Sequence, residues 1–334
     1  MTLDKVRLGH DGPEVGVQGL GCMGMSFGYG PTDAGEALGT LKRALELGVT
    51  LYDTADMYGI GENERFLSPF VTAHRDEITI ASKFGIELDP ARPEYRGTRN
   101  DRAYIRRAIE GSLSRLGVET IDLYYMHRRD PDVPIEETVS SMAELVREGK
   151  VRRLGLSEVT GPELRAAYQV HPIAAIQSEW SVFSRDVERT AVPAAAELGV
   201  TFVPYSPLGR GFLTGAVTST QGLAEGDFRH SQPRFTGDNA AKNAELLAPL
   251  RRIAEVRGLT PGQVALAWVH QRASVHGLTV VPIPGTRRRS RVEENTAAAA
   301  VTLTADELAL LEPIAGQVSG ERYADMGPTS AGRE

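Results

Sequence analysis

The chain has 334 residues, of which 41% are hydrophobic and 24% charged, and this composition excludes a disordered or collagen-like protein. No apolar run reaches about 18 residues, and the N-terminus lacks the apolar core of a signal peptide, so we expect neither a membrane span nor secretion. The one cysteine, Cys22, excludes an intrachain disulfide and favours a cytoplasmic protein. A net charge of −7 argues against nucleic acid or an anionic membrane as partner.

Strand-like and helix-like segments alternate along nearly the whole chain. Two short apolar runs, 6–8 and 15–17, flank turn residues and predict an N-terminal β-hairpin. Eight further apolar runs predict strands. They cover residues 16–21, 50–53, 78–83, 122–127, 151–157, 174–179, 201–205 and 279–283.

Helical spacing of apolar residues fills the intervals between these strands. A first helix is expected to begin at Asp33 and to end at Gly48. Strand–helix units in one uninterrupted series predict parallel strands, and eight of them favour a (β/α)₈ TIM barrel over a doubly wound sheet. The other predicted helices cover residues 101–116, 135–146, 162–168, 186–198 and 261–270.

No linker or repeat divides the chain, so we expect residues 1–334 to form a single barrel domain. Two segments depart from the strand–helix rhythm. Residues 206–238 form a long polar, glycine-rich loop after the seventh strand, and a loop of this length in a compact domain indicates a function. Residues after about 316 are predicted to form an irregular tail.

Residues 19–24 have the spacing G-x-G-x-x-G that is typical of dinucleotide-binding sheets. In those folds the last glycine opens a helix whose N-terminus faces the pyrophosphate. Here Gly28, Gly30 and Pro31 follow, and no helix can begin before about Thr32. We therefore interpret the segment as a glycine-rich loop that leaves the first barrel strand and can still touch a ligand.

Titratable side chains end three consecutive predicted strands: Asp53, Lys83 and His127. The carboxyl ends of barrel strands form one rim, and neighbouring strands lie about 4.8 Å apart, so these side chains are expected to meet. Tyr58 follows Asp53 by five residues and can fold over the same rim. A lysine that ends an apolar strand needs a carboxylate partner, which Asp53 can supply. A tyrosine beside an ammonium group suits carbonyl reduction, because the phenol donates a proton and the ammonium favours its ionised form.

Residues 52–59, 81–85 and 124–128 resemble the three signatures of the aldo-keto reductases, and the likeness runs from about Leu8 to about Tyr323. The resemblance implies a (β/α)₈ barrel that reduces small carbonyl compounds with NADPH. It also implies that Tyr58 donates the proton, Lys83 tunes Tyr58, Asp53 pairs with Lys83, and His127 orients the carbonyl. The Gly-Glu-Arg-Tyr sequence at 320–323 is similar to that of the bacterial, fungal and plant branch.

The resemblance also implies a cofactor site. Ser157, Glu158 and Gln177 correspond to groups that hold the nicotinamide carboxamide, although Glu158 stands where many members carry asparagine and can only accept hydrogen bonds. Tyr205 corresponds to the tyrosine that stacks on the nicotinamide ring. The glycine-rich loop and the belt around the pyrophosphate complete this side of the site. Their residues are Met23, Gly24, Ser206, Leu208, Gly209 and Arg210.

Four arginines fall within five positions, at 287, 288, 289 and 291, where a helix is expected to begin. Cations at a helix N-terminus oppose its macrodipole unless an anion binds, so the cluster indicates a phosphate site. Together with the resemblance, it predicts a pocket for the 2′-phosphate of NADPH. The pocket residues are Gly285, Thr286, Arg287 and Arg291, with Glu294 and Asn295 near the adenine.

Other functions fit parts of the pattern. A regulatory subunit resembling the potassium-channel β-subunits would keep the barrel and the four rim residues, but those subunits often add an N-terminal extension. A Schiff-base aldolase using Lys83 is disfavoured, because Asp53 would keep the lysine protonated. Metal-dependent hydrolysis is disfavoured, because no strand ends in His-x-His or clustered carboxylates, and we expect no metal.

Overall fold

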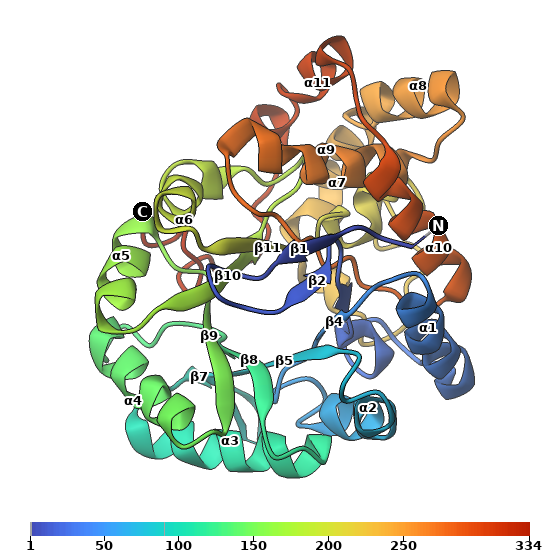
Figure 1. Cartoon of the computed structure of the whole chain (residues 1–334). Coiled ribbons are helices and arrows are strands. Elements are labelled where there is room, and N and C mark those ends of the chain that lie inside the picture. The colour runs from blue at the N-terminus through green and yellow to red at the C-terminus, as the bar shows by residue number, and fades with distance from the viewer. Residues whose placement is uncertain (1, 90) are drawn as a thin grey trace.

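Parallel strands form a barrel surrounded by helices, as Figure 1 shows. The computed structural model describes residues 2–89 and 91–334, and within them every side chain except those of residues 89 and 92–96. Seven parallel strands are hydrogen-bonded in the order β11-β10-β9-β8-β5-β4-β3. They are β3 Leu20–Gly21, β4 Leu51–Asp53, β5 Thr79–Phe84, β8 Ile121–Met126, β9 Val151–Ser157, β10 Ile173–Glu179 and β11 Thr201–Tyr205.

The eighth predicted strand, 279–283, closes the barrel through separate hydrogen bonds. Phe202 N donates to Thr279 O over 2.9 Å, and Ile283 N donates to Pro204 O over 3.0 Å. On the other side Gly19 N donates to Pro282 O over 2.9 Å. Because proline has no N–H, Pro282 and Pro284 interrupt the ladder and prevent a continuous strand. The predicted barrel fold is therefore confirmed, with an irregular eighth position.

The N-terminal hairpin is also confirmed, and it closes one end of the barrel. Strands β1 Lys5–Arg7 and β2 Glu14–Gly16 pair antiparallel, and Figure 1 shows them lying across the barrel opening. Leu8 and Val15 are fully buried against barrel residues such as Ala175 and Val281. The predicted first barrel strand, 16–21, is shorter than expected, because residue 16 belongs to the hairpin and only β3 joins the barrel.

Polar caps fix the ends of the helices around the barrel. The Asp33 carboxylate accepts a hydrogen bond from Glu36 N and begins α1, and Asp101 does the same for α3. Gly117 ends α3 with a φ of 69°, which glycine adopts readily. The helices that follow the eight barrel segments are α1 Ala34–Glu46, α2 Glu62–Ala73, α3 Arg102–Leu116, α4 Ile135–Arg147, α5 Gly161–Val170, α6 Ala191–Leu198, α9 Pro261–His276 and α10 Arg289–Ala297.

The periodicity did not predict α2. Its inner face carries Asn63 and Glu64 in place of apolar residues, and Pro69 lies within it, so the apolar repeat is broken. The predicted helix 186–198 is divided into the short 3₁₀ helix η2 Asp186–Glu188 and α6. Further elements without a prediction are the hairpin β6 Ile86–Asp89 and β7 Arg92–Thr98, and the helices α7 Gly237–Glu245, α8 Ala248–Arg257 and α11 Ala305–Leu311.

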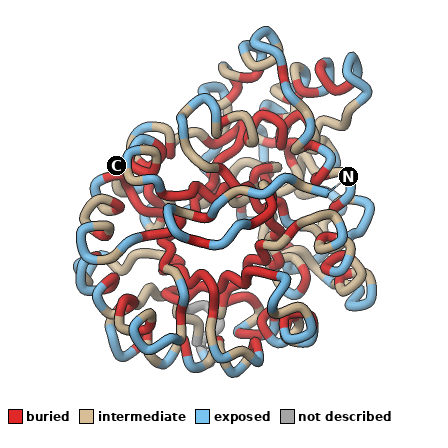
Figure 2. Tube along the Cα trace, viewed as in Figure 1, coloured by how far each residue is buried: buried red, intermediate tan, exposed pale blue. Residues whose placement is uncertain are grey.

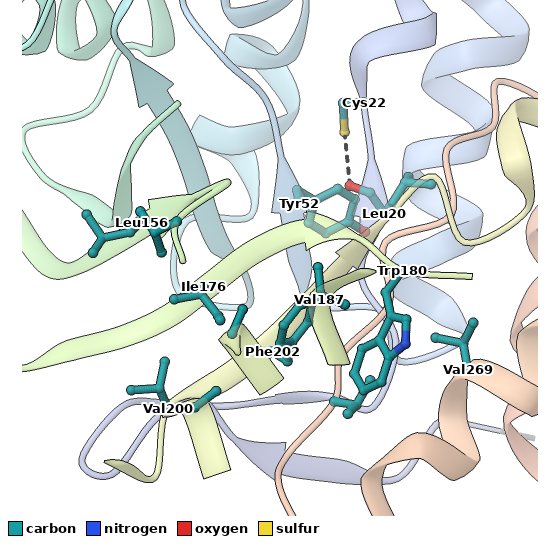
Figure 3. Close-up of a cluster of buried hydrophobic side chains, with 14 of the residues drawn as sticks. Leu20, Cys22, Tyr52, Leu156, Ile176, Trp180, Val187, Val200, Phe202 and Val269 are labelled. Carbon is teal, nitrogen blue, oxygen red and sulfur yellow. Dashed lines mark hydrogen bonds between the residues drawn. The ribbon is translucent and has the colours of Figure 1, made fainter. Parts of the chain in front are cut away.

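The main hydrophobic core lies between the strands and the helices. Figure 2 shows buried residues along the barrel and exposed residues along the outer turns. In the part of the core drawn in Figure 3, the Trp180 and Phe202 rings lie 4.8 Å apart between centroids. Cys22 is also buried there and its thiol donates to Leu20 O over 3.6 Å. This packing fixes the strand ends that carry the predicted site.

The long loop after β11 and the C-terminal tail lie at the end of the barrel opposite the hairpin, against the rim. The loop contains the 3₁₀ helices η3 Gly209–Thr214, η4 Phe228–Ser231 and η5 Pro233–Phe235. The tail after η7 Ala315–Gln317 has no regular structure, yet Arg322, Thr329 and Ser330 are buried. Long-range side-chain contacts therefore hold the tail. Two further 3₁₀ helices are η1 Met23–Met25 and η6 Ala298–Ala300.

Candidate active site

A buried ion pair lies at the carboxyl ends of β4 and β5. The Lys83 ammonium donates to Asp53 Oδ1, and also to Thr54 O over 2.7 Å. Gln177 Nε2 donates to Asp53 Oδ2 over 2.8 Å, so both carboxylate oxygens are occupied. Burial lowers the pKa of Lys83, and the Asp53 charge opposes that shift.

Tyr58 is held over this pair by the loop between β4 and α2. The Tyr58 ring centroid lies 5.3 Å from Lys83 Nζ. Asn63, from the first turn of α2, accepts from Thr54 Oγ1 over 2.6 Å and donates to Cys22 O over 2.9 Å, which ties the loop to the rim. Asn63 is a supporting residue that the sequence reasoning missed. A buried asparagine on the inner face of a helix was the available signal.

Burial and two neighbouring charges set the pKa of Tyr58 in the structure. We expected the Lys83 ammonium to favour the ionised phenol. In the structure burial raises the pKa of Tyr58 well above 10, and the Asp53 carboxylate raises it further, while Arg128 lowers it. Because burial disfavours the phenolate and Asp53 offsets the charge of Lys83, the Tyr58 phenol is protonated before the reaction. A protonated phenol is the state that a proton donor needs.

His127 follows β8 and completes the group. Its backbone N–H donates to Phe84 O over 2.7 Å, which fixes it against the end of β5. The His127 and Tyr58 rings lie 5.9 Å apart between centroids and are nearly perpendicular. Asp53, Tyr58 and His127 all line one cavity of about 520 Å³, and Lys83 lies buried behind it.

Most residues predicted to bind a cofactor line the same cavity. Ser157 and Gln177 lie opposite each other on the adjacent strands β9 and β10. Glu158, Gly209 and Glu294 do not line it. Those that do are Met23, Gly24, Ser157, Gln177, Tyr205, Ser206, Leu208, Arg210, Gly285, Thr286, Arg287, Arg291 and Asn295.

Glu158 is directed into the protein, away from the cavity. Its carboxylate is fully buried and accepts hydrogen bonds from Tyr205 OH at 2.7 Å, from Ser330 N at 3.0 Å, and from both terminal nitrogens of Arg322 at 2.9 and 3.1 Å. Burial alone would raise the pKa of Glu158, but the charges of Arg322 and Arg128 outweigh it and lower the pKa to about 2. Glu158 therefore anchors the C-terminal tail beneath Tyr205.

The belt after β11 is strained and densely hydrogen-bonded. Ser206 and Arg210 have φ angles of 48° and 58°, which side-chain-bearing residues rarely adopt. The Arg210 guanidinium pairs with Glu179 at 2.9 Å and lies 4.5 Å from the Tyr323 ring centroid. The Tyr323 hydroxyl lies 3.2 Å from that of Tyr205. The tail thus supplies an aromatic wall of the cavity.

The long loop reaches across the cavity to the glycine-rich loop. Phe228 N donates to Gly28 O over 3.0 Å, and the rings of Phe228 and Tyr29 are 5.0 Å apart between centroids. The Arg229 guanidinium lies 4.8 Å from the Tyr29 ring centroid. These contacts join two segments about 200 residues apart, and sequence reasoning identified each loop but not their contact.

The arginines at the start of α10 have different partners. Arg287 donates to Gly30 O over 3.1 Å, to Tyr29 O over 3.1 Å and to Thr32 Oγ1 over 2.8 Å, so it braces the glycine-rich loop. Arg291 pairs with Glu294 at 2.8 Å, and Arg289 pairs with Glu36 at 2.9 Å. The Arg288 side chain lines the cavity and makes no hydrogen bond or ion pair with any residue that the structure describes.

Two features are absent from residues 2–89 and 91–334, the part of the chain that the structure describes. No helix among them has both the length and the apolar character needed to cross a membrane. No group of three or more His, Cys, Asp or Glu side chains in these ranges is placed to hold a metal ion.

Comparison with known proteins agrees with the geometry. The profile of the Aldo/keto reductase family matches residues 19–315, and the chain belongs to this family. The structure is similar to the glycerol dehydrogenase of Gluconobacter oxydans, with a TM-score of 0.83 and 28% identity over 97% of this chain and 99% of that one. It is also similar to an aldo-keto reductase of Bacillus halodurans in its holo form, with a TM-score of 0.74 and 28% identity over 97% of this chain and 100% of that one. An aldo-keto reductase of Klebsiella pneumoniae in complex with NADP and acetate matches with a TM-score of 0.70 and 26% identity over 95% and 99%.

Proposed function

We propose that the protein is an NADPH-dependent reductase of aldehydes and ketones, with Tyr58 as the proton donor. The observation that carries the proposal is the meeting of Tyr58, His127 and the Lys83–Asp53 pair at one end of a cavity. That cavity extends to the arginines at the start of α10. The Klebsiella relative crystallised with NADP supports the same cofactor here.

The donor set of the cavity fits NADPH. Tyr205 offers a ring for the nicotinamide, and Ser157 and Gln177 offer a hydroxyl and an amide for its carboxamide. At the other end, Thr286, Arg288 and Arg291 offer hydrogen-bond donors and positive charge for the 2′-phosphate, and Arg287 holds the glycine-rich loop beside them. Arg288 is added to the predicted set, because it lines the cavity and its guanidinium makes no hydrogen bond or ion pair with the described residues.

The residues of the rim perform the acid–base part of the reaction. When bound, NADPH supplies a hydride for the carbonyl carbon. Tyr58 gives its proton to the carbonyl oxygen as negative charge develops there. The Lys83 ammonium, 5.3 Å from the Tyr58 ring, then stabilises the phenolate that forms, and Asp53 keeps Lys83 charged and in place. His127 orients the carbonyl towards Tyr58.

Replacing Tyr58 by phenylalanine tests the proposal. Tyr58→Phe removes only the hydroxyl, so we expect the fold and NADPH binding to remain and turnover to fall about 10²- to 10⁴-fold. Turnover is measured as NADPH oxidation with a panel of aldehydes and ketones, alongside the control Tyr168→Phe on the outer helix α5. A Tyr58→Phe variant that keeps most of the wild-type turnover would show that another group donates the proton.

A further inference from the structure

Arg128 is a cation at the catalytic end of the cavity. It directly follows His127 and lines the cavity together with Tyr58. Its Nη1 donates to His127 O over 2.7 Å and to Ser157 Oγ over 3.3 Å. Both acceptors are uncharged, so these bonds orient the guanidinium without neutralising it.

Asp53, which lines the same cavity, and Glu158, whose charge acts on Arg128, are both hydrogen-bonded to other groups. Asp53 accepts from Lys83 and Gln177, and Glu158 accepts from Arg322, Tyr205 and Ser330. Across the described part of the chain, Arg128 makes no ion pair. The charge of Glu158 acts on Arg128, but no carboxylate accepts a hydrogen bond from the Arg128 guanidinium among the residues that the structure describes. An arginine cannot lose its proton in a protein, and a partly buried guanidinium is costly when its N–H groups lack acceptors. The arrangement therefore favours an anion in front of Arg128.

The other arginines that line the cavity are ion-paired or lie at its far end. Arg210 pairs with Glu179, and Arg229 pairs with Asp227 at 2.7 Å, both in the belt after β11. The remaining three lie at the start of α10, at the end proposed for the 2′-phosphate. Arg128 alone among the cavity arginines adjoins the proposed reacting centre, so its charge is available to the substrate.

Resting on the proposed reductase function, we propose that Arg128 binds a carboxylate of the substrate, and that the preferred substrates are small oxo-acids. Consecutive residues are about 3.8 Å apart at Cα, so His127 and Arg128 can hold the carbonyl and the carboxylate of one small molecule. Nε and Nη2 of Arg128 make no bond within the described residues, and a guanidinium edge matches a carboxylate in two parallel hydrogen bonds. Phe27, Met57 and Ile86 line the same end and suit a short apolar body between the two groups.

Matched substrate pairs test the proposal. We compare 4-oxobutanoate with 4-oxobutanamide, and 4-carboxybenzaldehyde with its methyl ester, for the wild type and Arg128→Gln. The wild type should prefer the acid in kcat/KM, and Arg128→Gln should lower the acid-to-neutral ratio about 10- to 100-fold, or about 1.4 to 2.8 kcal/mol. Arg128→Lys should keep part of the preference. The matched control Arg65→Gln removes the same charge from the outer face of α2, where Arg65 is 53% exposed, and should leave the ratio unchanged.

Two results would overturn the proposal while leaving the reductase function intact. One is a wild type whose kcat/KM shows no preference for acids. The other is an Arg128→Gln variant whose kcat/KM falls equally for acid and neutral substrates. A binding measurement decides the point independently of turnover. Calorimetric titration of the protein with NADP⁺ present should give tighter binding of benzoate than of benzamide, and Arg128→Gln should abolish the difference. Equal binding of the two compounds by the wild type would refute the carboxylate site, whereas absent turnover with every carbonyl would refute the reductase function.

Discussion

Lys83 is a charged side chain enclosed within the barrel, and its environment is built around Asp53. Neither residue is more than 5% exposed at its side chain. Each charge has one further hydrogen bond. Lys83 donates to Thr54 O, and Asp53 accepts from Gln177. Buried pairs of this kind are costly to break, because the remaining partner is left as a buried charge.

Lys83→Met should therefore affect both stability and activity. We expect the free energy of unfolding to fall by about 3 to 5 kcal/mol, because Asp53 loses its counter-charge, and turnover to fall with it. The double variant Lys83→Met/Asp53→Asn removes both charges and should recover much of the stability but none of the turnover. Urea unfolding of the three proteins measures this. An unchanged free energy of unfolding in Lys83→Met would contradict a desolvated pair.

At the scale of elements, neighbouring arginines at the start of α10 have different contacts. Arg287 binds backbone carbonyls of the glycine-rich loop, whereas Arg288 faces the cavity without a partner in the described structure. The first residue should therefore affect the shape of the cofactor site, and the second should affect its charge. The local sequence does not distinguish the two arginines. Their contacts differ because residues 29–32 lie beside Arg287.

The two arginines should differ in cofactor binding. Arg288→Ala should raise the dissociation constant of NADPH about 10- to 100-fold and leave NADH nearly unchanged, because a charge-assisted contact to the 2′-phosphate is lost. Arg287→Ala should weaken both cofactors, because the glycine-rich loop loses its brace. Fluorescence titration gives the constants for both cofactors and both variants. Equal weakening of NADPH and NADH in Arg288→Ala would place the 2′-phosphate elsewhere.

The C-terminal tail is the second element whose role depends on distant contacts. Arg322 is 1% exposed and bridges Glu158 and Asp186, and Arg333 donates to Glu158 O over 2.6 Å. Glu158 itself has a φ of 53°, a strained conformation at the end of β9. The contacts that hold the tail also hold Tyr205 and Tyr323 against the cavity.

Breaking this anchor should release the tail and alter the cavity wall. Arg322→Met should lower the free energy of unfolding by about 3 to 5 kcal/mol, since Glu158 stays buried without its main partner. Amide hydrogen exchange over 320–334 should rise, and KM should rise as Tyr323 loses its position. The control Arg189→Met breaks a more exposed tail contact, to Glu334 at 3.2 Å, and should cost less than about 1 kcal/mol. Unchanged exchange in Arg322→Met would show that other contacts hold the tail.

The sequence predicted what local patterns determine. Apolar strands that end in Asp53, Lys83 and His127 predicted the barrel and the rim, because parallel strands bring their carboxyl ends together. Glu158 was expected beside the carboxamide, but a partner 164 residues away turns its carboxylate to the tail. The position of Arg287 depends in the same way on a loop about 257 residues earlier. Long side chains with several possible partners are placed by tertiary contacts that no local pattern records.

At the scale of the whole molecule, the barrel is closed where its first and last segments meet. Gly19 bonds to Pro282 beside β3, and the preceding Gln18 is buried beneath α9. There the His270 Nε2 lies 3.2 Å from Gln18 Oε1. Burial lowers the pKa of His270 to about 4, so this contact is made by a neutral imidazole. The joint between the two ends of the barrel therefore contains a histidine whose protonation is opposed by burial.

This histidine should produce a pH-dependent stability. In the unfolded chain His270 takes up a proton near pH 6.5, whereas in the folded barrel it does so only near pH 4. Between these values the unfolded state binds more protons, so stability is full above about pH 6.5 and decreases as pH falls towards 4. The difference in pKa corresponds to about 3 kcal/mol.

His270→Gln tests this, because glutamine keeps a hydrogen-bonding side chain that does not titrate. The free energy of unfolding of the wild type minus that of the variant should fall by about 3 kcal/mol as pH falls from 6.5 to 4. Urea unfolding at half-unit pH steps measures the difference, with His10→Gln in the exposed hairpin turn as the control. A difference that stays constant from pH 7.5 to 4 would show that the folded barrel does not hold His270 in its neutral form.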